Sequence, residues 1–237
     1  GVDVTYNEDA LLLYTSESTS GSGLYIKEDK PTGGYKGFLE LDPGFDWEYG
    51  IIDYKDGKLL MRTNYNAPNW RLVEVDLNDP KPEHYKDIIP ETEQVLSSVQ
   101  IAGGKLVAEY MKDVCSVLNI YKMDGSFIRE VELPVKGTVN GFSGDRKSNV
   151  AFYSFASFTY PTTVFKYDME TGVSEEFRAP TIDFDPSQYE VKQVFYPSKD
   201  GTKIPMFIVH KKGLELNGTN PTLLYGYGGF DISIQPR

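Results

Sequence analysis

The sequence is poor in the residues that most often carry hydrolytic or metal chemistry. It has two histidines and one cysteine in 237 residues. The lone Cys115 excludes a disulfide within the chain, and we expect it to be a bystander thiol in a connection between strands rather than a nucleophile. No Gly-x-Ser-x-Gly motif, which presents a nucleophilic serine on a sharp strand-to-helix turn, occurs anywhere. The 237 residues therefore contain no recognisable nucleophile with its base.

Positive charge and long apolar runs are also scarce. Lysine and arginine number 24 against 35 acidic residues, a net charge of -11, which argues against nucleic acid as a partner. No apolar run approaches the roughly 18 residues of a membrane span, so we expect no membrane partner. No zinc-ligand or phosphate-cradling spacing occurs, so we expect no metal and no cofactor.

The start of the chain, Gly1-Val2-Asp3, has neither an initiator methionine nor a signal-peptide pattern, as in a trimmed chain. The sequence gives no sign of a disulfide-stapled secreted fold. We expect a cytoplasmic location, with the periplasm as the alternative.

Aromatic residues are abundant, with 17 tyrosines and 13 phenylalanines, and they lie in runs that also contain threonine and valine. These residue types favour strands over helices. Four segments share one layout, and in each a strand alternates apolar and polar residues. These strands begin at residues 24, 72, 118 and 164, so the spacing is 48, 46 and 46 residues. Turn sequences such as Lys55-Asp56-Gly57 and Ala102-Gly103-Gly104 separate the strands.

A repeat of about 46 residues made of short antiparallel strands is typical of β-propeller blades. We therefore predict an all-β fold with about four blades over residues 1–180. A stacked β-sandwich is the alternative, because sandwiches also have strands every 8–12 residues or so.

The pattern changes after Pro180. Residues 181–190 are polar and contain Pro186, which predicts a linker. Residues 191–210 then read as a hairpin with its turn at Lys199-Asp200-Gly201, and His210 at its end is expected to be exposed. Thr222-Leu223-Leu224-Tyr225 is short and largely apolar, which predicts a buried central strand.

The stretch from Gln193 to Lys212 and the loop Tyr225-Gly226-Tyr227-Gly228-Gly229-Phe230 closely resemble the prolyl oligopeptidases. The upstream repeats are similar to the seven-bladed propeller of the same family. The resemblance implies that residues 1–180 are about the fourth to seventh blades, and that residues 191–237 begin an α/β-hydrolase catalytic domain that is truncated here. It further implies that the propeller restricts access to the active site, and that the connections at residues 15–23 and 111–116 face the enclosed cavity.

The same resemblance assigns two site residues. Tyr227, the second tyrosine of the loop, corresponds to the family's oxyanion-hole donor, and Phe230 to a residue lining the proline-side substrate pocket. A phenol stays protonated at neutral pH and can donate one hydrogen bond to a tetrahedral oxyanion. We expect the three glycines of the loop to let the backbone bend sharply.

The resemblance thus implies a fragment of a serine endopeptidase that cleaves short peptides after proline. The fragment is expected to be inactive by itself, because serine, aspartate and histidine in triad order are absent. It is also expected to self-associate. The alternatives are a related oligopeptidase B-like or acylaminoacyl-type peptidase, and a non-catalytic propeller that binds peptides or proteins.

Overall fold

The computed structural model describes residues 1–30, 37–42, 44–183, 185–230 and 232–237, and within them the fold is all-β. The first sheet contains β1 (Val2–Val4), β2 (Ala10–Thr15), β3 (Gly23–Glu28) and β4 (Leu39–Asp42). The second contains β5 (Tyr49–Lys55), β6 (Lys58–Thr63), β7 (Arg71–Asp76) and β8 (Lys86–Ile89). The third contains β9 (Val95–Ala102), β10 (Lys105–Lys112), β11 (Cys115–Tyr121) and β12 (Phe127–Glu130). The fourth contains β13 (Thr138–Gly144), β14 (Val150–Ser157), β15 (Tyr160–Asp168) and β16 (Ser174–Arg178).

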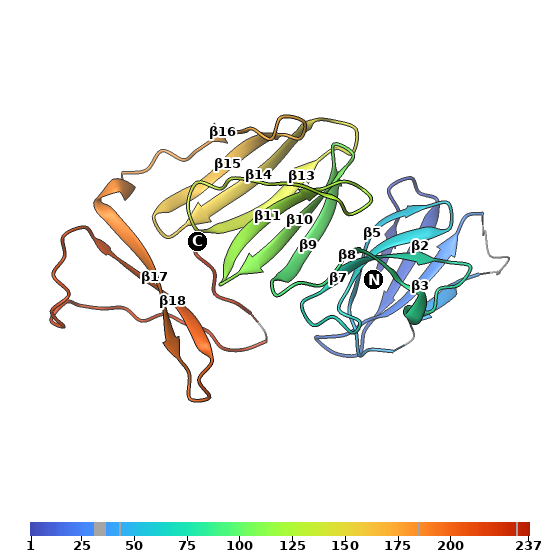
Figure 1. Ribbon diagram of the computed structural model, residues 1–237, viewed down its shortest axis with the longest axis horizontal. Helices are drawn as coiled ribbons and strands as arrows, with labels where there is room; N and C mark the ends of the chain where they lie inside the picture. The colour runs from blue at the N-terminus through green and yellow to red at the C-terminus, as the bar shows by residue number, and fades with distance from the viewer. Residues whose placement is uncertain (31–36, 43, 184, 231) are drawn as a thin grey trace.

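Each of these sheets is an antiparallel meander in chain order, and we call them blades 1 to 4. Figure 1 shows them following one another from blue to yellow, with a separate hairpin beside the last two. That hairpin pairs β17 (Tyr189–Pro197) with β18 (Lys203–Lys211). Two 3-10 turns, Pro82–His84 and Pro186–Gln188, complete the regular structure of the described residues. The predicted propeller blades are confirmed, and the β-sandwich alternative is wrong.

Tight turns set the register of the strands. The β5–β6 and β9–β10 connections each have two residues, and all four have positive φ: Asp56 and Gly57, then Gly103 and Gly104. This geometry matches the twist of a hairpin and favours Asp-Gly and Gly-Gly. The β10–β11 turn, Asp113-Val114, adopts the same conformation without a glycine. Its sequence carries no turn signal, and Cys115 accordingly begins β11 instead of lying in a connection, where it was expected.

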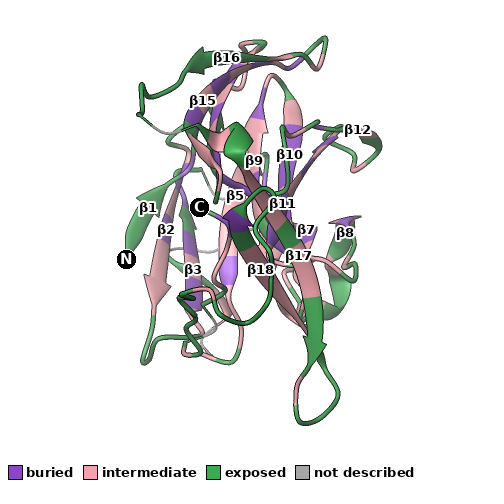
Figure 2. Cartoon of the chain, turned by 90° about the vertical axis from the view of Figure 1, so that its left-hand side faces the viewer, coloured by how far each residue is buried: buried purple, intermediate pink, exposed green. Residues whose placement is uncertain are grey.

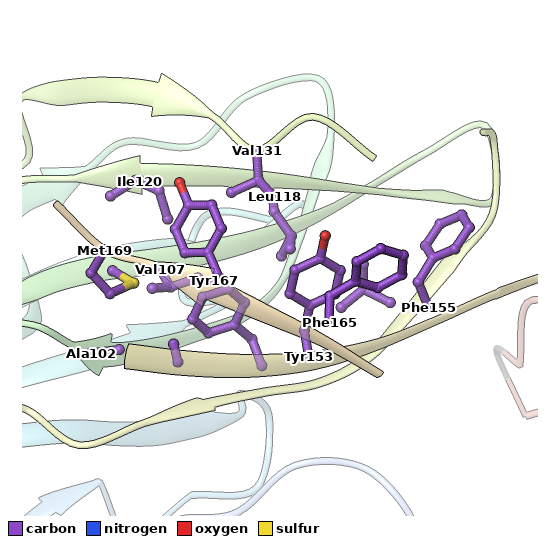
Figure 3. Close-up of a cluster of buried hydrophobic side chains, with 13 residues drawn as sticks. Ala102, Val107, Leu118, Ile120, Val131, Tyr153, Phe155, Phe165, Tyr167 and Met169 are labelled. Atoms are coloured by element: carbon purple, nitrogen blue, oxygen red, sulfur yellow. The ribbon is translucent and has the colours of Figure 1, made fainter. Parts of the chain in front are cut away.

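The hydrophobic core lies between blades rather than at one centre. One buried cluster joins blades 1 and 2, a second joins blades 2 and 3, and a third joins blades 3 and 4. In the third, the Tyr153 ring stacks between Phe142 and Phe165, with centroid distances of 5.9 and 5.2 Å. Figure 3 shows Tyr153 and Phe165 of blade 4 in one cluster with Leu118 and Ile120 of blade 3. Each blade is therefore stabilised by its neighbour through apolar burial.

Polar side chains also cross between blades. The Tyr54 hydroxyl of blade 2 donates a hydrogen bond to the buried Glu28 carboxylate of blade 1. Arg146, in the β13–β14 turn of blade 4, forms an ion pair with Asp53 of blade 2 and donates to the Ile52 carbonyl at 3.0 Å. Its guanidinium also lies 4.3 Å from the centre of the Tyr6 ring of blade 1. One arginine thus links three blades.

A partly buried carboxylate lies between blades 3 and 4. Glu109 on β10 accepts hydrogen bonds from Ser116 at 2.9 Å and from Ser98 at 3.3 Å. The Ser116 hydroxyl in turn accepts the Val139 amide of blade 4 at 3.0 Å. Burial raises the pKa of the Glu109 carboxyl, and the two serine hydrogen bonds act in the opposite direction. The ionised carboxylate is therefore less favoured in the folded state than in water.

This raised pKa predicts a pH-dependent effect of Glu109→Gln. As the pH rises through the ordinary carboxyl range, the unfolded chain loses its Glu109 proton before the folded chain does, so stability falls. The amide cannot ionise, so its stability does not fall in this way. We expect the free energy of unfolding of the variant, minus that of the wild type, to be greater at pH 8 than at pH 4. Urea unfolding at both values measures this. Glu93→Gln, at an exposed position just before β9, is the control. A difference between variant and wild type that does not change with pH would contradict it.

Candidate active site

The loop that carries the two expected site residues lies open to solvent. Residues 225–230 contain neither strand nor helix. Tyr227 is 56% exposed and Phe230 is 81% exposed. Gly228, Gly229 and Phe230 line an open hollow with Ile232 and Ser233. The structure therefore places Tyr227 and Phe230 on one loop and encloses neither.

The strand expected at residues 222–225 is absent, and that prediction is wrong. Leu223 is 91% exposed, and the neighbouring Leu224 and Tyr225 are also open to solvent. A strand needs backbone partners on at least one side, and no segment of the described chain pairs with these residues. Apolar composition alone is therefore insufficient to form the strand.

The loop glycines do not take the role expected of them. Gly226, Gly228 and Gly229 all lack a positive φ, whereas Phe230 has a φ of 54°. A Cβ added at Gly226 or Gly228 would meet nothing within 4 Å. The expected sharp bend at glycine is absent from this conformation, and the left-handed residue is the phenylalanine that follows.

The remaining candidate side chains also do not assemble a catalytic group. His210 is buried, contrary to expectation, with Nδ1 2.9 Å from the Lys211 carbonyl and Nε2 3.3 Å from Glu190 Oε1. His210 lies on β18 opposite Glu190 in the ladder, and its side chain lies against that carboxylate. Across the described ranges, no three His, Cys, Asp or Glu residues come together as a metal site would require. Within the same ranges, no helix has the length and apolarity to cross a membrane.

The tail and the hairpin both approach one end of the blades. The Gln235 side-chain amide donates to Met111 Sδ at 3.3 Å, at the end of β10. Gln193 of β17 donates to the Asp113 carbonyl at 2.8 Å. The Phe207 ring of β18 lies 5.3 Å from that of Phe158, in the β14–β15 turn. These contacts lie at or beside the connections between the second and third strands of blades 3 and 4.

Sequence reasoning did not identify Gln193 or Arg146. Gln193 lies 80 residues from Asp113, and Arg146 lies 93 residues from Asp53. Interactions at such separations leave no local pattern in the sequence.

Figure 2 shows the contrast in burial between the blades, whose strands are largely purple, and the green and pink hairpin.

The chain matches the model of the prolyl oligopeptidase N-terminal β-propeller domain over residues 1–180. It is 42% identical over 233 residues to a prolyl endopeptidase of Elizabethkingia miricola, which covers 98% of this chain and 32% of the relative. It is 33% identical over 250 residues to prolyl oligopeptidase A of Galerina marginata, covering 99% of this chain and 32% of that one. The chain thus spans about a third of the length of these relatives.

Solved structures of a prolyl endopeptidase and a prolyl oligopeptidase also match this chain. A prolyl endopeptidase structure superimposes with a TM-score of 0.90 at 37% identity, covering 99% of this chain and 34% of its own. Prolyl oligopeptidase B of Galerina marginata, solved with a 35-residue hydrolysis and macrocyclisation substrate, gives 0.89 at 31% identity, with coverage of 100% and 34%. Oligopeptidase B of Leishmania major, at 19% identity and a TM-score of 0.81, shares the fold. The family match over the four blades and the relatives aligned along the whole chain show that this protein belongs to the prolyl oligopeptidase family.

Proposed function

We propose that this chain is part of a serine endopeptidase that cleaves short peptides after proline. The observation that carries the proposal is the 42% identity to a prolyl endopeptidase, which continues beyond the blades into residues 191–237. A propeller that only binds proteins has no need of a hydrolase-like hairpin and a Tyr-Gly-Tyr-Gly-Gly-Phe loop. Relatives named as peptidases, one of them solved with a peptide substrate, support a peptide as the substrate class.

In the intact enzyme, a serine outside these 237 residues attacks the carbonyl carbon of the prolyl bond. The attack forms a tetrahedral oxyanion, and loss of the leaving amine gives an acyl-enzyme that water then hydrolyses. Tyr227 donates its hydroxyl hydrogen to the oxyanion, while Phe230 packs against the proline ring. The blades restrict access, so that short peptides reach the site. The exposure of Tyr227 and Phe230 leaves both side chains free to meet such partners.

The location and the specificity remain predictions. We propose a cytoplasmic protein, as the sequence favours. Preference for proline distinguishes this proposal from an oligopeptidase B-like or acylaminoacyl-type activity. Paired chromogenic substrates with proline, arginine or an acylated amino acid at the cleaved position would separate the three activities in the full-length enzyme.

The 237-residue chain alone should not hydrolyse a chromogenic Gly-Pro substrate. It lacks a nucleophile on a strand-helix elbow, and Tyr227 by itself only stabilises charge. Product release should equal that of buffer. Turnover that persists through repurification and is blocked by a fluorophosphonate would contradict this expectation.

In the full-length enzyme, Tyr227→Phe should lower kcat by about 10²–10³, or roughly 2.7–4 kcal/mol, because one oxyanion donor is lost. The bond strengthens in the transition state, so KM should change less than kcat. Tyr225→Phe is the matched control, since the first tyrosine of the loop has no donor role in this proposal. Steady-state kinetics on a slow amide substrate tests both variants. Wild-type kinetics for Tyr227→Phe would make this tyrosine a packing residue only.

The isolated chain should self-associate. Val2 and Val4 of β1 pair in register with Leu13 and Leu11 of β2, so all four share the face of blade 1 that points away from blade 2. On blade 4, Phe152 and Phe177 form a partly exposed aromatic pair with ring centroids 5.1 Å apart. Apolar sheet faces that lack a neighbour drive association.

Light scattering measures this association. The mass should exceed the 26.7 kDa of one chain and fall toward it when Val4→Lys places a charge on the open face. Val173→Lys, at an exposed position in the β15–β16 turn, is the control and should leave the mass unchanged. A stable wild-type monomer at high concentration would contradict the expectation.

A further inference from the structure

One cross-strand pair of the hairpin β17–β18 contacts the propeller. Gln193 and Phe207 lie opposite each other in the antiparallel register, so their side chains share one face of the hairpin. Phe207 contacts Phe158 of the β14–β15 turn, and Gln193 reaches the Asp113-Val114 turn between β10 and β11. A single pair therefore contacts blades 3 and 4 at once. Figure 1 shows the orange hairpin beside these two blades.

The Gln193 side-chain amide makes two hydrogen bonds, one through its nitrogen and one through its oxygen. Its Nε2 donates to the Asp113 carbonyl at 2.8 Å, and its Oε1 accepts from Lys136 Nζ at 2.7 Å. Lys136 lies in the connection between blades 3 and 4, and its own carbonyl accepts from the Ser157 hydroxyl at 2.8 Å. A primary amide is suited to this position because it donates and accepts within one planar group. Gln193, Asp113 and Lys136 line one hollow at this junction.

The turn that Gln193 contacts has an unfavourable backbone conformation. Asp113 has a φ of 49° and Val114 a φ of 59°. A left-handed conformation is uncommon for any residue other than glycine and is a true outlier for a β-branched residue such as valine. Such conformations persist where surrounding contacts favour them, and they concentrate at functional sites. The hydrogen bond from Gln193 to the Asp113 carbonyl is one such contact.

We propose that Gln193 is an interdomain lock, which holds the hydrolase-side hairpin on blades 3 and 4 and keeps the Asp113-Val114 turn in its left-handed conformation. Release of the hairpin and relaxation of the turn are then one coupled event. Because the β10–β11 turn and Met111 lie at the same end of blade 3, the lock links hairpin docking to the end of the propeller that Gln235 contacts. The lock requires only the 237 residues and is independent of the proposed peptidase activity.

Hydrogen-exchange mass spectrometry of the 237-residue chain tests the lock. Gln193→Leu keeps the approximate size of the side chain and removes both hydrogen bonds. We expect exchange to rise about fivefold or more in peptides covering β17–β18 and the β10–β11 turn, because losing even one of the two hydrogen bonds has roughly that effect. Peptides covering β5–β8 should be unchanged. Lys192→Leu places the same residue on the opposite face of β17 and should leave the exchange of the turn at the wild-type level.

Two further variants separate the effects of the two hydrogen bonds, to Asp113 and from Lys136. Gln193→Glu loses the donor to Asp113 and keeps an acceptor for Lys136, so exchange should rise at the turn. Lys136→Met removes only the second bond and leaves the bond to Asp113, so exchange should rise in the hairpin and the turn together, and by less than in Gln193→Leu. The proposal is wrong if Gln193→Leu leaves the turn as protected as in the wild type, or if Lys192→Leu has the same effect. If Gln193→Leu also raises exchange in β5–β8, that variant has lost general stability and Gln193→Glu decides the question. The proposal is then wrong if Gln193→Glu shows wild-type exchange at the turn, or if its exchange rises equally at the turn and in β5–β8.

Discussion

The structure depends on the need of each four-stranded sheet to cover its apolar faces with a neighbouring sheet. A short meander has two faces and too little burial within itself to be stable. The three clusters between successive blades meet this need, and they hold the largest buried side chains, such as Tyr153 and Leu72. The same requirement leaves the outward faces of blades 1 and 4 incomplete in the 237-residue chain.

Polar contacts fix how the blades are set against one another. Apolar packing is tolerant of small shifts, whereas a hydrogen bond has a narrow geometry. Arg146 connects blade 4 to blades 1 and 2 near one end of the strands, while the Glu109 network joins blades 3 and 4 through Ser116. Glu109 lowers the stability of the folded chain when it is ionised, because burial disfavours its charged form. These contacts give the blades one defined arrangement, against which the hairpin docks through Gln193.

The hydrolase-like segment shows how far local sequence can act without its tertiary partners. The hairpin β17–β18 forms because its two strands supply each other's backbone hydrogen bonds. Residues 222–225 have a strand-like composition, yet they form no strand and are exposed to solvent, because a central strand depends on neighbours from elsewhere in a sheet. The Tyr227 hydroxyl and the Phe230 ring are therefore present, but no enclosed site surrounds them.

The sequence by itself determined the blades, since the repeat of alternating strands and the Asp56-Gly57 and Gly103-Gly104 turns are local signals of spacing and φ. It also determined the family-like loop, because its residues are contiguous. Only the tertiary structure decided the burial of His210, the left-handed Asp113-Val114 turn, and the pairing of Arg146 with Asp53 and of Gln193 with Asp113. For the Arg146 and Gln193 pairings, the physical reason is separation along the chain. A strand or turn reflects forces among neighbouring residues, whereas a contact between residues about 80 to 90 positions apart exists only after the blades have packed.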